Sequence, residues 1–129
     1  MSNRHFFLAA LGAVVACATT ATGSGRHRSG NLLTAAEIAE NHADVNSAYD
    51  AVARLRPNWL TGRGPSSSSS GETAQVFVDG QVIGDVQAMR NIQAYYVASM
   101  EYFDTSQAGA KFGIRAGGAG AIEVRLKNP

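Results

Sequence analysis

The sequence is poor in cysteine and in charge of either sign, and both shortages restrict its function. Cys17 is the single cysteine among 129 residues, which excludes an intramolecular disulfide and a cysteine-based metal cluster. Charged residues make up 16% of the chain, and the formal net charge is +1. Nucleic-acid-binding domains and proteins that bind anionic lipid surfaces carry clustered lysine and arginine. We therefore expect no nucleic-acid partner.

Recognisable catalytic and metal-binding motifs are also missing from the sequence. Its three histidines are scattered at positions 5, 27 and 42, whereas metal ligands are usually clustered and held by outer hydrogen bonds. The serine run at 66–70 has no base placed by a motif such as Gly-x-Ser-x-Gly. We expect no metal, no cofactor and no identifiable small-molecule substrate, and we interpret the chain as a non-enzyme. A small envelope enzyme, with catalytic residues that meet only in space, is the less favoured alternative.

One apolar run near the N-terminus is too short to span a membrane. It covers residues 6–16 and follows a short basic start, whereas a spanning helix needs about 20 residues. A segment of this kind is typical of a secretory signal. The run ends in Val14-Val15-Ala16-Cys17, which resembles the bacterial lipobox. We expect a lipoprotein signal peptide over 1–16 and acylation of Cys17.

The residues after Cys17 indicate where the protein is held. Several acyl chains, at about 0.8 kcal/mol per buried CH₂, would anchor it firmly in a membrane. In lipoproteins, aspartate after the cysteine tends to retain the protein in the inner membrane, so Ala18 favours the outer membrane. We expect the lipid-anchored domain on the periplasmic face of that membrane. Residues 17–31 are rich in Thr, Gly and Ser, a composition that predicts a flexible tether. The folded domain is expected over 32–129.

Two short helices are expected before the serine run. Thr34 and Glu37 have the spacing of a capping box and predict the start of the first helix. The second helix is expected to begin at Asn46 or Ser47 and to end before Pro57. Its apolar face is predicted from a three-residue spacing at Tyr49, Val52 and Leu55.

Strand signals dominate the rest of the chain. Apolar residues at 76–78 and 81–83 flank Asp79-Gly80, a pair that favours a type I′ hairpin turn. Asp85 is placed to cap a short helix. A strand is predicted at 97–103, with alternate residues on one face: Ala98, Met100 and Tyr102.

The last strand is predicted at 121–127, after a one-turn helix at 106–111. Its apolar side chains point one way and its charged ones the other. The charged set is Glu123, Arg125 and Lys127. The chain is therefore expected to adopt an α+β fold, with a small mixed sheet and short helices. Four aromatic residues could form a binding surface, but we favour a core role for them: Tyr95, Tyr96, Tyr102 and Phe103.

Several of these segments occur in an order known from one protein family. Residues 76–80 match a "hydrophobic-x-hydrophobic-Asp-Gly" strand and turn, and residues 100–103 match "Ile-Glu-x-hydrophobic". Residues 108–113 match a small-residue turn that ends in an aromatic residue and glycine, and residues 120–127 match a final strand that ends in lysine. In this order the segments resemble the plug domain of TonB-dependent receptors. The resemblance implies a plug-like fold for 32–129.

The departures from that family restrict the function. The chain has no room for a barrel, because each spanning strand needs about 9–11 residues. The family's Ile-Arg-Gly strand is replaced by the serine loop, with only Arg63-Gly64 as a displaced candidate. We therefore interpret the protein as an envelope lipoprotein with a plug-like interaction domain, accessory to an outer-membrane system. The alternative is a plug module that acts in trans with a separately encoded barrel.

Three residues are candidate contacts to an outer-membrane or periplasmic protein: Trp59, Arg63 and Glu101. In the plug family, the residue that matches Glu101 lies on the strand facing the barrel wall and pairs with charged barrel residues. Without a barrel, Glu101 is either a solvated strand residue beside Arg125 or Lys127, or a docking charge for a separate partner. We favour the solvated interpretation, because nothing else in the sequence marks a docking surface.

Overall fold

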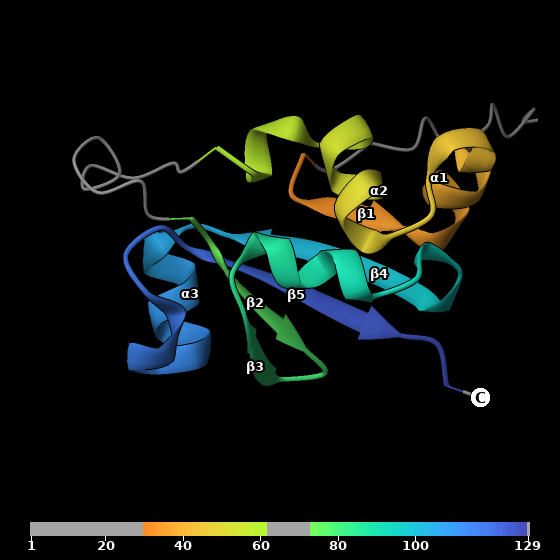
Figure 1. The fold of residues 1–129 in the computed structure, drawn as a ribbon. Helices are drawn as coiled ribbons and strands as arrows, with labels where there is room; N and C mark the ends of the chain where they lie inside the picture. Colours follow the sequence, from red (N-terminus) through yellow and green to blue (C-terminus); the bar gives the residue numbers. More distant parts are fainter. Residues whose placement is uncertain (1–29, 62–72, 129) are drawn as a thin grey trace, which may run out of the picture.

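The computed structural model describes residues 30–61 and 73–128, which form one five-stranded mixed sheet with short helices (Figure 1). The expected α+β class is therefore confirmed. The expected signal peptide, Cys17, Arg63 and the serine run at 66–70 lie outside the described residues.

The sheet has the strand order β1-β4-β5-β2-β3. Neighbouring strands are antiparallel except β2 and β5, which are parallel. The strands are β1 (Leu32–Thr34), β2 (Gln75–Val78), β3 (Gln81–Gly84), β4 (Val97–Phe103) and β5 (Ala121–Leu126). The strand β1 was not expected from the sequence, because its three residues carry no alternating pattern of their own and pair only with β4.

One face of the sheet is covered by α1 (Ala35–Glu40), α2 (Ala48–Leu55) and the 3-10 turn Val86–Asn91 (Figure 1). The main core lies between these helices and the strands, and apolar residues removed from water are its chief source of stability. Its largest fully buried members include Leu33, Val52, Trp59, Val76, Met89, Met100, Ile122 and Val124.

The helix α2 begins where the sequence predicted. The Ser47 hydroxyl accepts a hydrogen bond from the Asp50 amide at 3.1 Å, and the Asp50 carboxylate accepts one from the Ser47 amide at 3.0 Å. This reciprocal capping box satisfies two amides at the helix start. Hydrogen bonds from the Ser47 hydroxyl and amide hold the pKa of Asp50 below its usual value. The helix ends at Leu55, before Pro57, as expected.

The start of α1 follows the prediction in part. The Thr34 hydroxyl accepts from the Glu37 amide at 3.3 Å, as the capping pattern requires. The Glu37 carboxylate accepts from Arg56 at 2.9 Å, and both side chains are 11% exposed. Arg56 also donates to the Leu32 carbonyl at 3.0 Å. Glu37 therefore links α1 to the end of α2, a role that the sequence pattern did not indicate.

The hairpin of β2 and β3 has the expected turn. Asp79 and Gly80 have φ angles of 47° and 86°, the two positive values of a type I′ turn. After it, the Asp85 carboxylate accepts from the Gln87 amide at 2.9 Å and caps the following 3-10 turn, as predicted.

The strand β4 has the predicted bounds, but its first two side chains do not follow the predicted alternation. Its pairing with β5 shifts register between Val97 and Ser99, so Val97 is fully buried while Ala98 is half-buried. The prediction that Ala98 shares the buried face with Met100 was therefore wrong. A bulge of this kind breaks the strict alternation on which the prediction rested.

Candidate functional site

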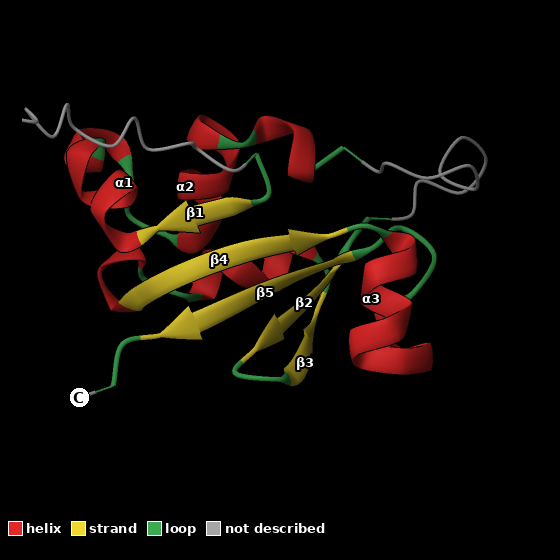
Figure 2. Cartoon of the chain, turned by 180° about the vertical axis from the view of Figure 1, so that it is seen from behind, coloured by secondary structure: helices red, strands yellow, loops and turns green. Residues whose placement is uncertain are grey.

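Among the described residues, the second face of the sheet is covered at one end only. There α3 (Thr105–Phe112) places Phe112 against Phe77, with ring centroids 3.9 Å apart and planes at 14°. Phe103 meets the Phe112 ring edge-on at 5.7 Å. Figure 2 shows this face from behind, with α3 beside one end of β4 and β5. This small second core was not predicted from the sequence.

The uncovered end of this face carries four side chains from three adjacent strands. We call it the open half-face, and it consists of Leu32, Ser99, Glu101 and Arg125. The register places Leu32 opposite Glu101 and Ser99 opposite Arg125. Leu32 is 36% exposed, Ser99 and Glu101 are half-buried, and Arg125 is exposed. The surface therefore combines one apolar, one hydroxyl and two charged side chains.

Glu123 lies where the open half-face meets α3, and two cations converge on it. Its carboxylate accepts from Lys111 of α3 at 2.6 Å and from Arg125 at 3.4 Å. The Lys111 ammonium also lies 4.2 Å from the centre of the Phe103 ring. Glu123 was expected on the side of its strand opposite the apolar residues, and on that side it is nevertheless only 6% exposed. Its burial is tolerated because both cations compensate its charge.

Glu101 lies directly opposite Glu123 on the neighbouring strand. The expected neighbours of Glu101 have other partners: Arg125 contacts Glu123, and the Lys127 ammonium donates to the Tyr95 carbonyl at 2.7 Å. Within residues 30–61 and 73–128, Glu101 has neither an ion pair nor a side-chain hydrogen bond. Among the described residues, the neighbour directly opposite Glu101 on β5 is therefore a second carboxylate and not Arg125 or Lys127, and Glu101 is half-buried.

Trp59 belongs to the core, which corrects its assignment as a candidate partner contact. Its side chain is 1% exposed and stacks on Tyr102, with ring centroids 6.0 Å apart. Its indole N–H donates to the Gly30 carbonyl at 3.0 Å. A buried ring whose polar group is already satisfied stabilises the fold and offers nothing to a partner. Arg63 lies outside the described residues, so of the three candidates only Glu101 is placed on a surface.

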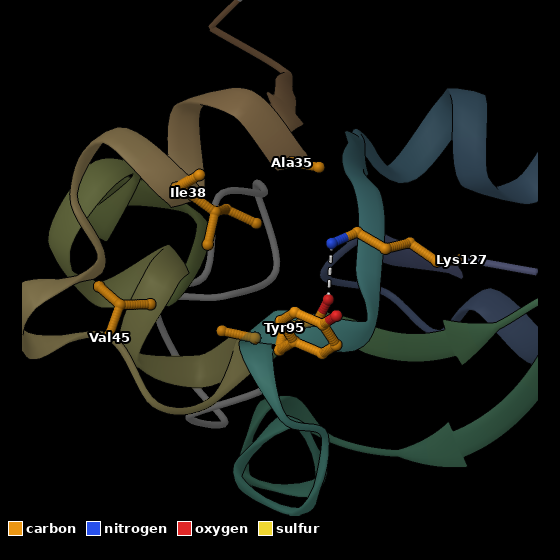
Figure 3. Close-up of a pocket in the computed structure, with 7 residues that line it drawn as sticks. Ala35, Ile38, Val45, Tyr95 and Lys127 are labelled. Atoms are coloured by element: carbon orange, nitrogen blue, oxygen red, sulfur yellow. Dashed lines mark hydrogen bonds between the residues drawn. The ribbon is translucent and has the colours of Figure 1, made fainter. Parts of the chain in front are cut away.

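A separate apolar pocket of about 470 Å³ lies near the end of β5 (Figure 3). It is lined by Ala35, Ile38, Ala39, Val45, Ala94, Tyr95 and Lys127. Tyr95 is 76% exposed and Tyr96 is 54% exposed, so the core role predicted for them was wrong, whereas Tyr102 is buried as expected. No sequence pattern indicated this pocket, because its residues come from separate segments of the chain.

The described residues meet the requirements of neither a metal site nor a membrane-spanning helix. Across the described ranges, no group of three or more His, Cys, Asp or Glu could hold a metal ion. In the same ranges, no helix is both long and apolar enough to cross a membrane.

The sequence matches no family model, and no curated protein and no solved structure is significantly similar to it. The resemblance to receptor plug domains therefore stays a prediction from the sequence motifs.

Proposed function

We propose that this chain is a lipid-anchored protein of the bacterial envelope whose domain binds a partner protein through the open half-face. It is not an enzyme in this proposal, and Glu101 is its docking charge. The observation that carries the proposal is the position of Glu101 opposite Glu123, with no cation of its own among the described residues. The α+β fold presents this carboxylate beside exposed Leu32 on a face that α3 leaves uncovered (Figure 2).

The energetics of the pair support this role for Glu101. Like charges directly opposite each other on neighbouring strands are destabilising, whereas favourable cross-strand pairs contribute roughly 0.2–1 kcal/mol. Lys111 and Arg125 relieve this repulsion on the Glu123 side. On the Glu101 side, a lysine or arginine of a bound partner would supply the missing charge. Arginine suits such a position well, because its guanidinium can bind a carboxylate with two parallel hydrogen bonds.

The N-terminal segment supports a location of this interaction at the outer membrane. A diacylglycerol-modified Cys17 and a tether over 17–31 would keep the domain within reach of proteins of the outer membrane. The preferred partner is thus an outer-membrane or periplasmic protein that presents a basic side chain. The alternative is a plug module in trans, in which the partner is a separately encoded TonB-dependent barrel. The plug-like motifs favour that alternative, and the identity of the partner separates the two.

Site-specific photocrosslinking in living cells tests the proposal. A photoreactive amino acid at Ser99 lies on the open half-face, while the same probe at Ala53 lies on an exposed position of α2. We expect a defined adduct from position 99 that is absent from position 53 and that weakens when Glu101→Gln is added. If the adduct from position 99 is insensitive to Glu101→Gln in a folded protein, the docking role of Glu101 is wrong.

A further inference from the structure

The pocket near the end of β5 contains one charged group in otherwise apolar surroundings. Its lining consists mainly of alanine and branched aliphatic side chains, and among the described residues Lys127 is its one ionisable lining residue besides the phenol of Tyr95. Figure 3 shows the Lys127 side chain pointing toward Tyr95, with Ile38 and Val45 on the opposite side of the pocket. Its volume of about 470 Å³ is within the range of about 300–1,000 Å³ that small-molecule sites occupy.

Lys127 is held in place by three contacts. Its backbone amide donates to the Tyr96 carbonyl at 2.8 Å, and its ammonium donates to the Tyr95 carbonyl at 2.7 Å. The ammonium also lies 4.8 Å from the centre of the Tyr95 ring. An ammonium group has three donors, and the carbonyl of Tyr95 uses one. Within residues 30–61 and 73–128 the two others have no hydrogen-bond acceptor, so they can serve a ligand in the pocket.

We propose that this pocket binds a small amphiphilic monocarboxylate, a molecule with one carboxylate and an unbranched apolar body. The carboxylate would accept hydrogen bonds from the Lys127 ammonium, and the apolar body would lie against Ile38, Val45 and Ala94. A charge-assisted hydrogen bond fixes the head group, while burial of CH₂ groups contributes about 0.8 kcal/mol each. The site is distinct from the open half-face, so either proposal can fail without the other.

The competing explanation of the Lys127 contacts is structural. In it, their one role is to hold the end of β5 against the turn that contains Tyr95. In that case the charge of Lys127 would matter for stability and not for the choice of ligand. A neutral or cationic amphiphile would then bind as well as a carboxylate. Comparison of ligands that share a chain and differ in head group separates the two explanations.

The test uses decanoate, 1-decanol and decyltrimethylammonium, each titrated below its micelle concentration into the ¹⁵N-labelled full chain. Amide chemical shifts report binding residue by residue, so binding in the pocket is separated from contact elsewhere. We expect decanoate to shift the amides of Ala39, Ala94 and Lys127, and to bind at least about tenfold more tightly than the other two. Equal binding of the three, or decanoate shifts confined to other residues, overturns the proposal, as does the absence of binding.

Matched variants test the roles of the charge and of the cavity. Lys127→Gln should weaken decanoate about tenfold or more, and Lys127→Arg should restore most of the affinity. Arg115→Gln, which removes an exposed charge outside the pocket, should have no effect. Ala39→Leu should fill part of the pocket and weaken binding, whereas Ala53→Leu on exposed α2 should not. Unchanged affinity in both Lys127→Gln and Ala39→Leu would overturn the proposal.

Discussion

Glu101 of β4 and Glu123 of β5 lie directly opposite each other, and among the described residues the two cations nearby both bind Glu123. The two carboxylates therefore have opposite roles in the folded chain. Glu123 is buried and charge-compensated, so it contributes to the attachment of α3 to the sheet. Glu101 is half-buried and has no cation among the described residues, which is why the proposed function makes it the docking charge.

This asymmetry predicts opposite changes in stability for two identical substitutions. Glu101→Gln should leave the free energy of unfolding unchanged or raise it by up to about 1 kcal/mol, because it removes a like-charge contact. Glu123→Gln should lower it by about 1–3 kcal/mol, because Lys111 and Arg125 lose their shared anion. Urea denaturation of the two variants measures both values. Equal losses in both variants would mean that Glu101 is already compensated in the folded chain.

The capping box of α2 predicts a pH-dependent contribution to stability. The hydrogen bonds from Ser47 lower the pKa of Asp50 in the folded state, so the ionised carboxylate stabilises the fold. This contribution is complete above the ordinary aspartate pKa of about 3.9 and is lost as the pH falls through the lower folded pKa. The destabilisation caused by Asp50→Asn should therefore be largest near neutral pH and should shrink in acid. A difference that stays constant between pH 7 and pH 2 would contradict this assignment.

The turn between β2 and β3 predicts a strong preference at position 80. Gly80 has a φ angle of +86°, and a Cβ added there would meet no atom within 4 Å, so the cost of substitution comes from the backbone and not from a clash. Gly80→Val should destabilise the fold by about 1–3 kcal/mol. Gly80→Asn should cost less, because asparagine tolerates positive φ better than branched residues do. Similar denaturation midpoints for the two variants would show that the turn conformation is not maintained.

The lipobox-like segment predicts acylation of Cys17. Cells grown with a clickable fatty acid should label the wild-type protein and not Cys17→Ser, because the thioether forms only on the thiol. The variant should also accumulate with the uncleaved N-terminal segment. Labelling of both proteins, or of neither, would mean that Cys17 carries no lipid anchor.

The elements predicted correctly from the sequence are those with local signals. The Ser47–Asp50 capping box, the Asp-Gly turn and the strand Val97–Phe103 are each specified by residues close together in the chain. Their hydrogen bonds and dihedral angles form within a few residues, so spacing and residue type are sufficient. The hairpin and α2 were found for this reason.

The features that were missed depend on contacts between distant segments. The strand β1 forms because its backbone pairs with the edge of β4. Glu123 is buried because α3 brings Lys111 over the sheet. The lack of a cation at Glu101 within the described part of the chain follows from the same arrangement, since Arg125 contacts Glu123 instead. The alternation of residues in one strand cannot show which helix covers that strand, so the open half-face was not predicted.

The most direct test of the central claim is a charge exchange between Glu101 and the partner, measured by the yield of the adduct from position 99. Mass spectrometry of that adduct identifies the partner and its nearest lysine or arginine. We predict that Glu101→Arg abolishes the adduct, that the partner's basic residue changed to glutamate also abolishes it, and that the two changes together restore it. If folded Glu101→Arg gives the wild-type yield, or if the combined changes fail to restore a lost adduct, Glu101 is not the docking charge.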